Sequence, residues 1–343
     1  MAQALALKYR PHEFSDLCEQ QSIVKILTNQ IETNTIKHGY LLVGPAGCGK
    51  TTSARIFANM INKGEGAPIE LDAASNNSVD DIRKLIEDAQ TKALDSEYKV
   101  FVIDECHMIT PQGWNAFLKT LEEPPAKSIF IMCTTNPEKV PATILSRVQR
   151  YNFQKISTEG IIDRLHHIVD CEFGEGAHIS DTALEYIAKL AEGGMRDAIT
   201  LLDKCLSYSE ELTVDTVVEA LGVADYDTMF RLVNLIFNND VKGVIEVIDN
   251  IFNSGIDLKQ FVKTYFEFIL DINIYRTTKD NDMHYVKIPV SYLDELKTFG
   301  NFEFDTCRKL LDMLVTLQFN IKYEHSPKSV IVADFILFME GNK

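Results

Sequence analysis

A glycine-rich loop constrains the fold of this chain more than any other feature of its sequence. Residues 44–51 read Gly-Pro-Ala-Gly-Cys-Gly-Lys-Thr, between an apolar run and an amphipathic helix, and they match GxxxxGK followed by Ser or Thr. In that context a phosphate-binding loop is favoured over a chance turn, because glycines let the backbone wrap a phosphate at a helix start. Lys50 is expected to reach the β- and γ-phosphates, and Thr51 to place a hydroxyl on Mg²⁺. The predicted nucleotide-binding residues here are Gly44, Pro45, Ala46, Gly47, Cys48, Gly49, Lys50, Thr51 and Thr52.

Two adjacent carboxylates follow a later apolar run. Residues 100–103 read Val-Phe-Val-Ile, and Asp104 and Glu105 come directly after them. A carboxylate at a strand end beside the phosphate loop can hold Mg²⁺, and a second one can orient or deprotonate an attacking water. We predict Asp104 as the metal ligand and Glu105 as the catalytic base; the alternative is a pair of solvated loop acids. His107 is interpreted as a helix-start residue rather than a catalyst.

The spacing of apolar residues predicts an α/β core followed by a helical remainder. Short apolar runs at 41–43, 69–71, 100–103 and 129–132 alternate with helix-period segments, as in βα units around a parallel sheet. After Phe153 the pattern is helical throughout, and the acidic stretch 224–227 suggests a further boundary. We predict a core at 1–153 and two helical segments, at 154–222 and 223–343.

Charge and cysteine content limit the partners and the compartment. The net charge is −16, which argues against a protein that coats nucleic acid or an anionic membrane. Residues 1–150 carry 16 basic and 18 acidic side chains and residues 151–343 carry 18 and 32, so DNA contact is expected in the first half. The seven cysteines form no CxxC pair, which fits a reducing cytoplasm. No apolar run approaches the roughly 20 residues that span a bilayer, and Lys8 and Arg10 interrupt any signal-peptide core, so no membrane is expected.

Several longer strings accompany the phosphate loop. They are Lys8-Tyr-Arg-Pro11, Phe14-Ser-Asp16, Asp72-Ala-Ala-Ser-Asn-Asn77, Asp104-Glu-Cys-His107, Asn115-Ala-Phe-Leu-Lys-Thr-Leu-Glu-Glu-Pro-Pro125, Cys133-Thr-Thr-Asn-Pro137, Ile144-Leu-Ser-Arg147 and Glu192-Gly-Gly-Met-Arg-Asp-Ala198. In this order they resemble the clamp-loader group of AAA+ ATPases, and within it the gamma/tau family of bacterial DNA polymerase III. The likeness covers about residues 4–222. It implies a P-loop AAA+ core with a parallel five-stranded sheet, a helical lid at 154–222 and an all-α oligomerisation collar at 223–343.

The resemblance also implies roles for arginines that spacing alone does not give. Arg147 resembles the finger that acts in trans on a neighbouring subunit's γ-phosphate, and Arg196 resembles the lid residue that contacts the nucleotide of its own subunit. On residue type alone each would be a surface ion pair. Arg10 and Pro11 lie in the segment that packs near the adenine and ribose.

The γ-phosphate sensor is not settled by the pattern. Thr135 aligns with the sensor of the family and is taken as catalytic, while the adjacent Asn136 stays open as an alternative. A Thr-Asn pair before proline is also ordinary turn chemistry.

The function that the resemblance implies is that of an ATP- and Mg²⁺-dependent motor subunit. It would assemble through its collar into a loader of about five subunits, open a ring-shaped sliding clamp and place it on primer–template DNA, with the replicative polymerase as an indirect partner. No polymerase site is recognisable in this chain. The competing hypotheses are a DNA translocase or helicase, suggested by Asp-Glu-Cys-His at 104–107, and a structural loader arm without turnover.

Candidate DNA contacts lie at the start of one predicted helix. Asn76, Asn77 and Ser78 could offer donors to backbone phosphates, and Arg83 and Lys84 follow on the same helix. The alternative is that Ser78 only caps the helix and that the basic side chains are solvated.

Three features depart from the family pattern. The four-cysteine zinc module that usually follows the phosphate-loop helix is replaced by residues 62–68 without cysteine, so no zinc is expected. The Val-Gly-Gln of the family reads Cys18-Glu19-Gln20, which changes the base pocket. The chain ends at 343 without the extension of longer forms, a length that fits a compact loader component of cellular or phage origin. Its expected location is the cytoplasm, which is the host cytoplasm for a phage-encoded protein.

Overall fold

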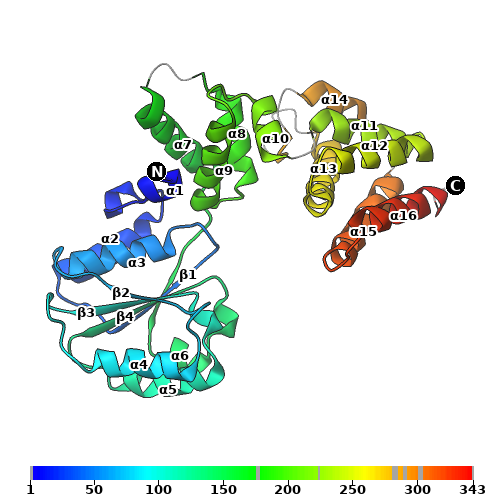
Figure 1. Cartoon of the computed structure of the whole chain (residues 1–343). Helices are drawn as coiled ribbons and strands as arrows, with labels where there is room; N and C mark the ends of the chain where they lie inside the picture. The colour runs from blue at the N-terminus through cyan, green and yellow to red at the C-terminus, as the bar shows by residue number, and fades with distance from the viewer. Residues whose placement is uncertain are drawn as a thin grey trace. The chain divides into compact units, whose positions relative to one another are not determined.

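The computed structural model describes residues 3–174, 178–222, 225–279, 285–288, 292–299 and 304–341 (Figure 1). The chain forms two compact units, the first made of Met1–Ala177 and Ile187–Asp203 and the second of His178–Tyr186 and Lys204–Lys343. This division passes through helices α8 (Asp181–Leu190) and α9 (Met195–Tyr208). The boundaries at 153 and 222 therefore stay predictions, and residues 223 and 224 beside the second lie outside the described residues.

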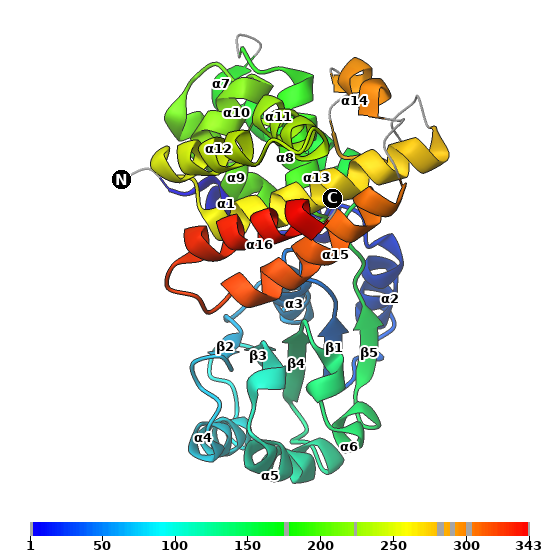
Figure 2. The same ribbon diagram turned by 90° about the vertical axis from the view of Figure 1, so that its right-hand side faces the viewer.

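A parallel sheet forms the centre of the first unit. Within the described residues its five strands lie in the order β2–β3–β4–β1–β5 (Figure 2). The strands are β1 (Gly39–Val43), β2 (Ile69–Asp72), β3 (Lys99–Asp104), β4 (Ser128–Thr134) and β5 (Gln149–Asn152). Val43 is in register with Thr134, and Asp72 with Asp104, so the carboxyl ends of these strands lie along one edge. Open parallel sheets bind ligands at that edge.

Helices cover both faces of the sheet, as the apolar strands require (Figures 1 and 2). Alternate strand residues pack on opposite sides: Leu42 lies in a core with Phe57, and Leu41 lies in another with Phe117. The face with Leu42 is covered by α2 (Gln21–Glu32) and α3 (Lys50–Ile61). The face with Leu41 is covered by α4 (Val79–Ala89), α5 (Pro111–Glu122) and α6 (Ala142–Leu145). The predicted α/β fold is confirmed.

Short elements and one further helix complete the first unit. They are α1 (Leu5–Lys8), η1 (Phe14–Asp16), η2 (Cys106–Met108), η3 (Pro137–Lys139) and α7 (Thr158–Phe173). The predicted helix starts have the capping residues that the sequence indicated: Ser78 accepts from the N–H of Asp81, and Thr110 accepts from the N–H of Gly113.

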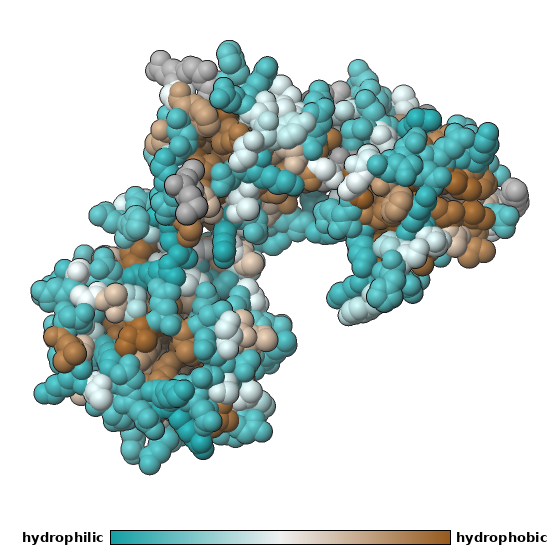
Figure 3. Space-filling view, in the orientation of Figure 1, coloured by the Kyte–Doolittle hydropathy of each residue, from teal (hydrophilic) through white to brown (hydrophobic). Residues whose placement is uncertain are grey.

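The second unit is helical around an aromatic core. Phe230 and Phe268 meet edge to face with ring centroids 4.8 Å apart, and Tyr226 lies against Phe268 at 6.1 Å. Figure 3 shows apolar patches among hydrophilic side chains over its helices. Exposed apolar side chains include Phe252, Phe319 and Leu337. The helices that lie wholly in this unit are α10 (Val214–Leu221), α11 (Tyr226–Phe237), α12 (Val241–Asn253), α13 (Leu258–Thr278), α14 (Leu293–Phe299), α15 (Phe304–Ile321) and α16 (Pro327–Gly341).

Candidate nucleotide-binding site

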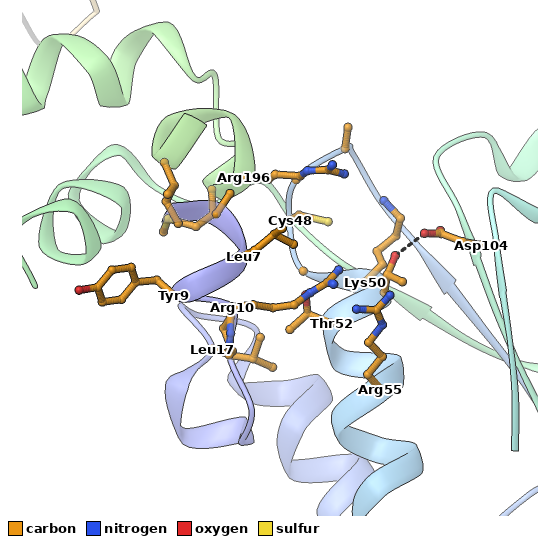
Figure 4. Close-up of a pocket in the computed structure, with 18 of the residues that line it drawn as sticks. Leu7, Tyr9, Arg10, Leu17, Cys48, Lys50, Thr52, Arg55, Asp104 and Arg196 are labelled. Atoms are coloured by element: carbon orange, nitrogen blue, oxygen red, sulfur yellow. Dashed lines mark hydrogen bonds between the residues drawn. The ribbon is translucent and has the colours of Figure 1, made fainter. Parts of the chain in front are cut away.

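A pocket of about 880 Å³ opens at the carboxyl edge of the sheet, in the first unit (Figure 4). The glycine-rich loop and α3 supply one wall, and the ends of β2 and β3 supply another. The rest comes from the N-terminal segment, from α7 with the residue Ile156 before it, and from the start of α9. Most of the predicted site residues line it. They are Arg10, Pro11, Ala46, Gly47, Cys48, Gly49, Lys50, Thr51, Thr52, Asp104, Glu105 and Arg196, together with the predicted DNA contact Asn76.

The glycine-rich loop has backbone angles that require its glycines. Gly47 has φ +72° and Gly49 has φ +98°, in the region that L side chains rarely adopt. Gly49 is the N-cap of α3, so the helix begins directly beneath the loop. The buried Lys50 donates to the carbonyl oxygens of Gly44 at 2.8 Å and Pro45 at 2.6 Å. Gly44 and Pro45 thus hold the lysine without lining the pocket themselves.

A hydroxyl and a carboxylate meet at the predicted metal position. The Thr51 hydroxyl donates to Asp104 Oδ2 at 2.8 Å, which is the bond drawn dashed in Figure 4. The backbone N–H of Glu105 donates to the other Asp104 oxygen at 3.0 Å and orients the carboxylate. Hard oxygen ligands beside a phosphate site are what Mg²⁺ prefers, so Thr51 and Asp104 fit this ion.

Glu105 is held by two neighbouring elements. Its Oε2 lies 3.0 Å from the Thr135 hydroxyl, which donates to it, and 3.2 Å from Nδ1 of His107. Glu105 has φ +44°, a left-handed conformation that persists for a non-glycine residue only where its surroundings enforce it. His107 lies in the 3₁₀ turn η2, and its Nδ1 is also 3.1 Å from the hydroxyl oxygen of Thr134 in β4. Thr135 does not line the pocket and reaches it through Glu105; Asn136, the open alternative, has a buried Oδ1 without a partner.

Arginine side chains gather along one side of the pocket. Arg10 donates to the Thr52 hydroxyl at 3.4 Å, and Arg55 forms an ion pair with Glu70. Figure 4 shows Arg10 beside Thr52 and Arg55, and Arg196 above the side chain of Cys48. Burial, followed by the positive charge of Arg55, lowers the pKa of the Arg10 guanidinium. A cluster of guanidinium groups of this kind favours a polyanionic ligand.

Arg147 lies outside this pocket. Its guanidinium donates to Glu122 Oε1 and to the Thr143 carbonyl oxygen, both at 2.6 Å. It does not line the nucleotide pocket of its own chain. A role in trans therefore stays a prediction.

The candidate DNA contacts form local bonds at the start of α4. Asn76 donates to the carbonyl of Asp72 at 3.1 Å. Ser78 caps α4, as the alternative interpretation expected. Arg83 pairs with Asp80 at 3.3 Å on the exposed surface, where such pairs add little stability. Lys84 is exposed and Asn77 partly so, and no contact here tests DNA binding.

The sequence interpretation missed part of the pocket wall. Arg55 and Arg164 line it, and neither belongs to a motif used for prediction. Arg55 could have been found, because it lies three residues after Thr52 on the phosphate-loop helix and so shares its face. Arg164 is on α7 and reaches the pocket only through tertiary packing, where it donates to the Tyr9 carbonyl at 2.9 Å.

Among the described residues, no group of three or more His, Cys, Asp or Glu side chains is placed to hold a metal ion. All seven cysteines are described as free thiols. No helix of the described ranges has the length and apolar character needed to cross a membrane. The absence of zinc stays a prediction.

Family models match consecutive parts of the chain. They are DNA polymerase III, delta subunit, at residues 64–157; DNA polymerase III clamp loader subunit, ATPase lid domain, at residues 160–211; and DNA polymerase III subunits gamma and tau domain III, at residues 212–323.

Sequence relatives point to the same family. The DNA polymerase III subunit tau of Bacillus subtilis is 36% identical over 298 residues, which cover 80% of this chain and 52% of the relative. The subunit gamma/tau of Mycoplasma genitalium is 34% identical over 302 residues, which cover 81% and 50%. That of Mycobacterium tuberculosis is 33% identical over 302 residues, which cover 81% and 52%. The chain thus spans about half the length of these relatives.

Solved structures share the fold. The RuvB Holliday junction branch migration motor of Thermotoga maritima superposes with a TM-score of 0.52 at 20% identity, over 66% of this chain and 79% of that one. At this identity the likeness concerns the fold, which is the predicted α/β P-loop architecture. The family models and the sequence relatives show that the chain belongs to the gamma/tau-like clamp-loader family of DNA polymerase III.

Proposed function

We propose that this chain is an ATPase motor subunit of a DNA polymerase clamp loader. ATP binding and hydrolysis would drive the opening of a sliding clamp and its placement on primer–template DNA. The observation that carries the proposal is the pocket in which Lys50, Thr51, Asp104 and Glu105 converge under a left-handed glycine loop. The family match does not favour the alternative of a translocase or helicase.

Binding of the triphosphate rests on the loop and the cations. The backbone N–H groups at the start of α3 and the ammonium of Lys50 would neutralise the β- and γ-phosphates. To do so, Lys50 must exchange its bonds to the Gly44 and Pro45 carbonyls for phosphate oxygens. Arg10 and Arg196, which line the pocket, would contact the remainder of the nucleotide.

Hydrolysis would use Glu105 as the base. Mg²⁺, held by Thr51 and Asp104, would supply charge neutralisation for the phosphate oxygens. Glu105 would orient a water and take its proton as the water oxygen bonds to the γ-phosphorus and the bond from that phosphorus to the bridging oxygen breaks. Thr135 donates to Glu105 and is suited to set its direction.

The partners that we propose follow from the family. Assembly with other loader subunits would involve the helices of the second unit, where Phe319 is 75% exposed and Leu337 66% exposed. Arg147 would leave its partner Glu122 to reach the nucleotide of a neighbouring subunit. Primer–template DNA would be contacted through its backbone near Asn76 and Asn77, and the site of action would be the cytoplasm.

A direct test compares two lysine substitutions. Lys50→Ala should abolish ATP binding and DNA- and clamp-stimulated hydrolysis, because it removes the buried ammonium at the phosphate loop. Lys25→Ala, an exposed lysine on α2, is the matched control and should leave both unchanged. Binding is measured by calorimetry and turnover by phosphate release. Unchanged turnover in Lys50→Ala would refute the active-site assignment.

A further inference from the structure

Two consecutive residues beside the nucleotide pocket adopt left-handed backbone angles although neither is glycine. Glu19 has φ +59° and Gln20 has φ +61°. They follow Leu17 and Cys18, which line the pocket, and precede helix α2. Side chains make this conformation unfavourable, so it persists only where other contacts enforce it. The contacts of the Glu19 and Gln20 side chains should therefore explain why these positions hold non-glycine residues.

The Glu19 carboxylate is bound at the start of helix α7. Its Oε1 accepts from the backbone N–H of Ser157 at 3.2 Å and also from the Ser157 hydroxyl. Ser157 is the N-cap of α7, and its Oγ accepts from the N–H of Gly160 at 3.0 Å. A carboxylate at a helix N-terminus is stabilised by the unpaired N–H groups and the helix dipole. Glu19 follows the pocket-lining Cys18 directly, so its contacts connect this part of the pocket wall to the first turn of α7.

Gly160 provides the space that this carboxylate occupies. A Cβ atom at position 160 would lie 2.8 Å from Oε1 of Glu19, closer than Cβ contacts normally are, so the end of the Glu19 side chain would have to move. Gly160 lies inside α7, where its backbone angles are helical and glycine is otherwise unfavourable. The glycine and the glutamate are therefore complementary in shape.

Gln20 adds a second connection to the same segment. Its side-chain amide donates to the Gln154 carbonyl at 2.8 Å and accepts from the Gln154 N–H at 3.2 Å. We call residues 18–20 together with residues 154–157 the clasp. Within the clasp, Cys18 and Ile156 both line the nucleotide pocket. The side chains of Glu19 and Gln20 therefore hold residues 154–157, which lead from β5 into α7, against the loop that contains Cys18.

Helix α7 in turn contributes to the pocket wall. Arg164 lines the pocket and donates to the backbone carbonyl of Tyr9 at 2.9 Å, next to Arg10. A shift of the first turn of α7 would move this arginine and Ile156 relative to the phosphate loop. The clasp is the connection that opposes such a shift.

We propose that Glu19 is a positioning residue for nucleotide binding, which acts through Ser157 to hold α7 against the pocket. The inference rests on the nucleotide function proposed above. It also accounts for a glutamate at a position where the backbone suits glycine: the carboxylate compensates for the unfavourable angles by anchoring the helix. Glu19 does not touch the nucleotide in this account.

The test begins with Glu19→Gly in the full chain. Glycine suits φ +59°, so the thermal unfolding midpoint should stay close to that of the unsubstituted protein. ATP binding with Mg²⁺, measured by calorimetry, should weaken about 10-fold, which corresponds to about 1.4 kcal/mol. In steady-state hydrolysis KM should rise by a similar factor while kcat stays within about twofold. Glu65→Gly, in an exposed loop away from the pocket, is the control and should bind ATP normally.

A second variant approaches the same contact from the other side. Gly160→Ala places a methyl group against the Glu19 carboxylate and should also weaken ATP binding. In the Glu19→Gly background the methyl group meets no carboxylate and keeps only its 3.3 Å approaches to Ile156 Cγ2 and Ser157 Oγ, so Gly160→Ala should cause a clearly smaller loss than in the unsubstituted chain. Additive effects of the two substitutions would contradict the clasp, as would ATP affinity that is unchanged in both single variants. If Glu19→Gly fails to fold, the Gly160→Ala result alone decides.

The outcomes separate this inference from the proposed function. An unsubstituted chain that binds no ATP would contradict the nucleotide function and the clasp together. Normal ATP binding that is lost in Lys50→Ala but unchanged in the Glu19 and Gly160 variants would contradict the clasp alone. Changes in thermal stability without changes in ATP affinity would mark Glu19 as structural only and would also overturn the inference.

Discussion

At the scale of single residues, the pocket combines groups that sequence motifs identify with groups that only folding brings near. Thr51 and Asp104 are 53 positions apart in the chain and hydrogen-bonded at 2.8 Å. Motif spacing predicted this pair, because a strand end and the phosphate loop meet at the same edge of a parallel sheet. The bonds from Thr135 and His107 to Glu105 were not predicted, since they depend on the left-handed turn at Glu105.

The metal site yields a prediction at this scale. Thr51→Val removes the hydroxyl at nearly constant volume and should reduce the gain in ATP affinity caused by Mg²⁺ by about 10-fold, or about 1.4 kcal/mol. Calorimetry with Mg²⁺ and with EDTA measures that gain. Thr52→Val is the comparison, because the Thr52 hydroxyl accepts from Arg10 and is not a predicted metal ligand. A Mg²⁺ effect that is the same in Thr51→Val and the unsubstituted chain would exclude Thr51 as a ligand.

At the scale of elements, strands with an apolar run were predictable, including the edge strand β2 at 69–71, whereas the polar strand β5 was not. The runs at 100–103 and 129–132 became β3 and β4, whose inner residues are fully buried. The fifth strand was expected from the family resemblance but could not be located, because in β5 only Tyr151 is buried and the other residues are polar. Helix α16 likewise has no clear apolar stripe, since apolar residues occur all around it.

A buried acid in α13 makes the stability of the second unit depend on pH. Burial raises the pKa of Asp271 to about 6, although its carboxylate accepts from the N–H groups of Lys287 at 2.8 Å and Ile288 at 3.2 Å. Because the folded-state pKa lies above the usual value near 4, the folded state binds the proton more tightly. The resulting stabilisation is fully present below about pH 4 and is lost as the pH rises through about 6.

Asp271→Asn isolates this contribution. The stability of the unsubstituted protein relative to Asp271→Asn should fall between pH 4 and pH 7, by roughly 3 kcal/mol for a shift of this size. Urea unfolding of both proteins at several pH values gives the difference, in which other titrating groups cancel. Asp334→Asn, in α16, offers a comparison with a half-buried acid, for which burial also raises the pKa. A stability difference that is independent of pH would contradict the assignment.

At the scale of the whole molecule, the family and the fold were predictable because several motifs occur in order along one chain. The division into two compact units passes through α8 and α9, and the domain boundaries at 153 and 222 stay predictions. The partners remain proposals. Arg147 connects the nucleotide site with the proposed assembly. It lies outside the nucleotide pocket of its own chain, and its proposed role depends on a neighbouring subunit.

Replacement of Arg147 should affect ATP hydrolysis by the assembled loader without affecting ATP binding by the isolated chain. Arg147→Ala should leave ATP binding by the isolated chain unchanged, yet lower hydrolysis by the assembled loader about 1,000-fold. Arg150→Ala, three residues away and bonded to Asn152 at 2.8 Å, is the matched control and should spare both. Loss of ATP binding in the isolated Arg147→Ala chain would show that the residue acts within its own subunit.

Nucleotide binding and bond cleavage should depend on different residues of the one pocket, with Glu105 needed only for cleavage. The most direct measurement is ATP affinity and ATP turnover of Glu105→Gln in the assembled loader, side by side with the unsubstituted protein. The amide keeps the size of the side chain but cannot accept the proton of water, so affinity should stay within about threefold while turnover falls at least about 100-fold. Turnover at the unsubstituted rate in Glu105→Gln would show that Glu105 is not the base and that this pocket does not hydrolyse ATP as proposed.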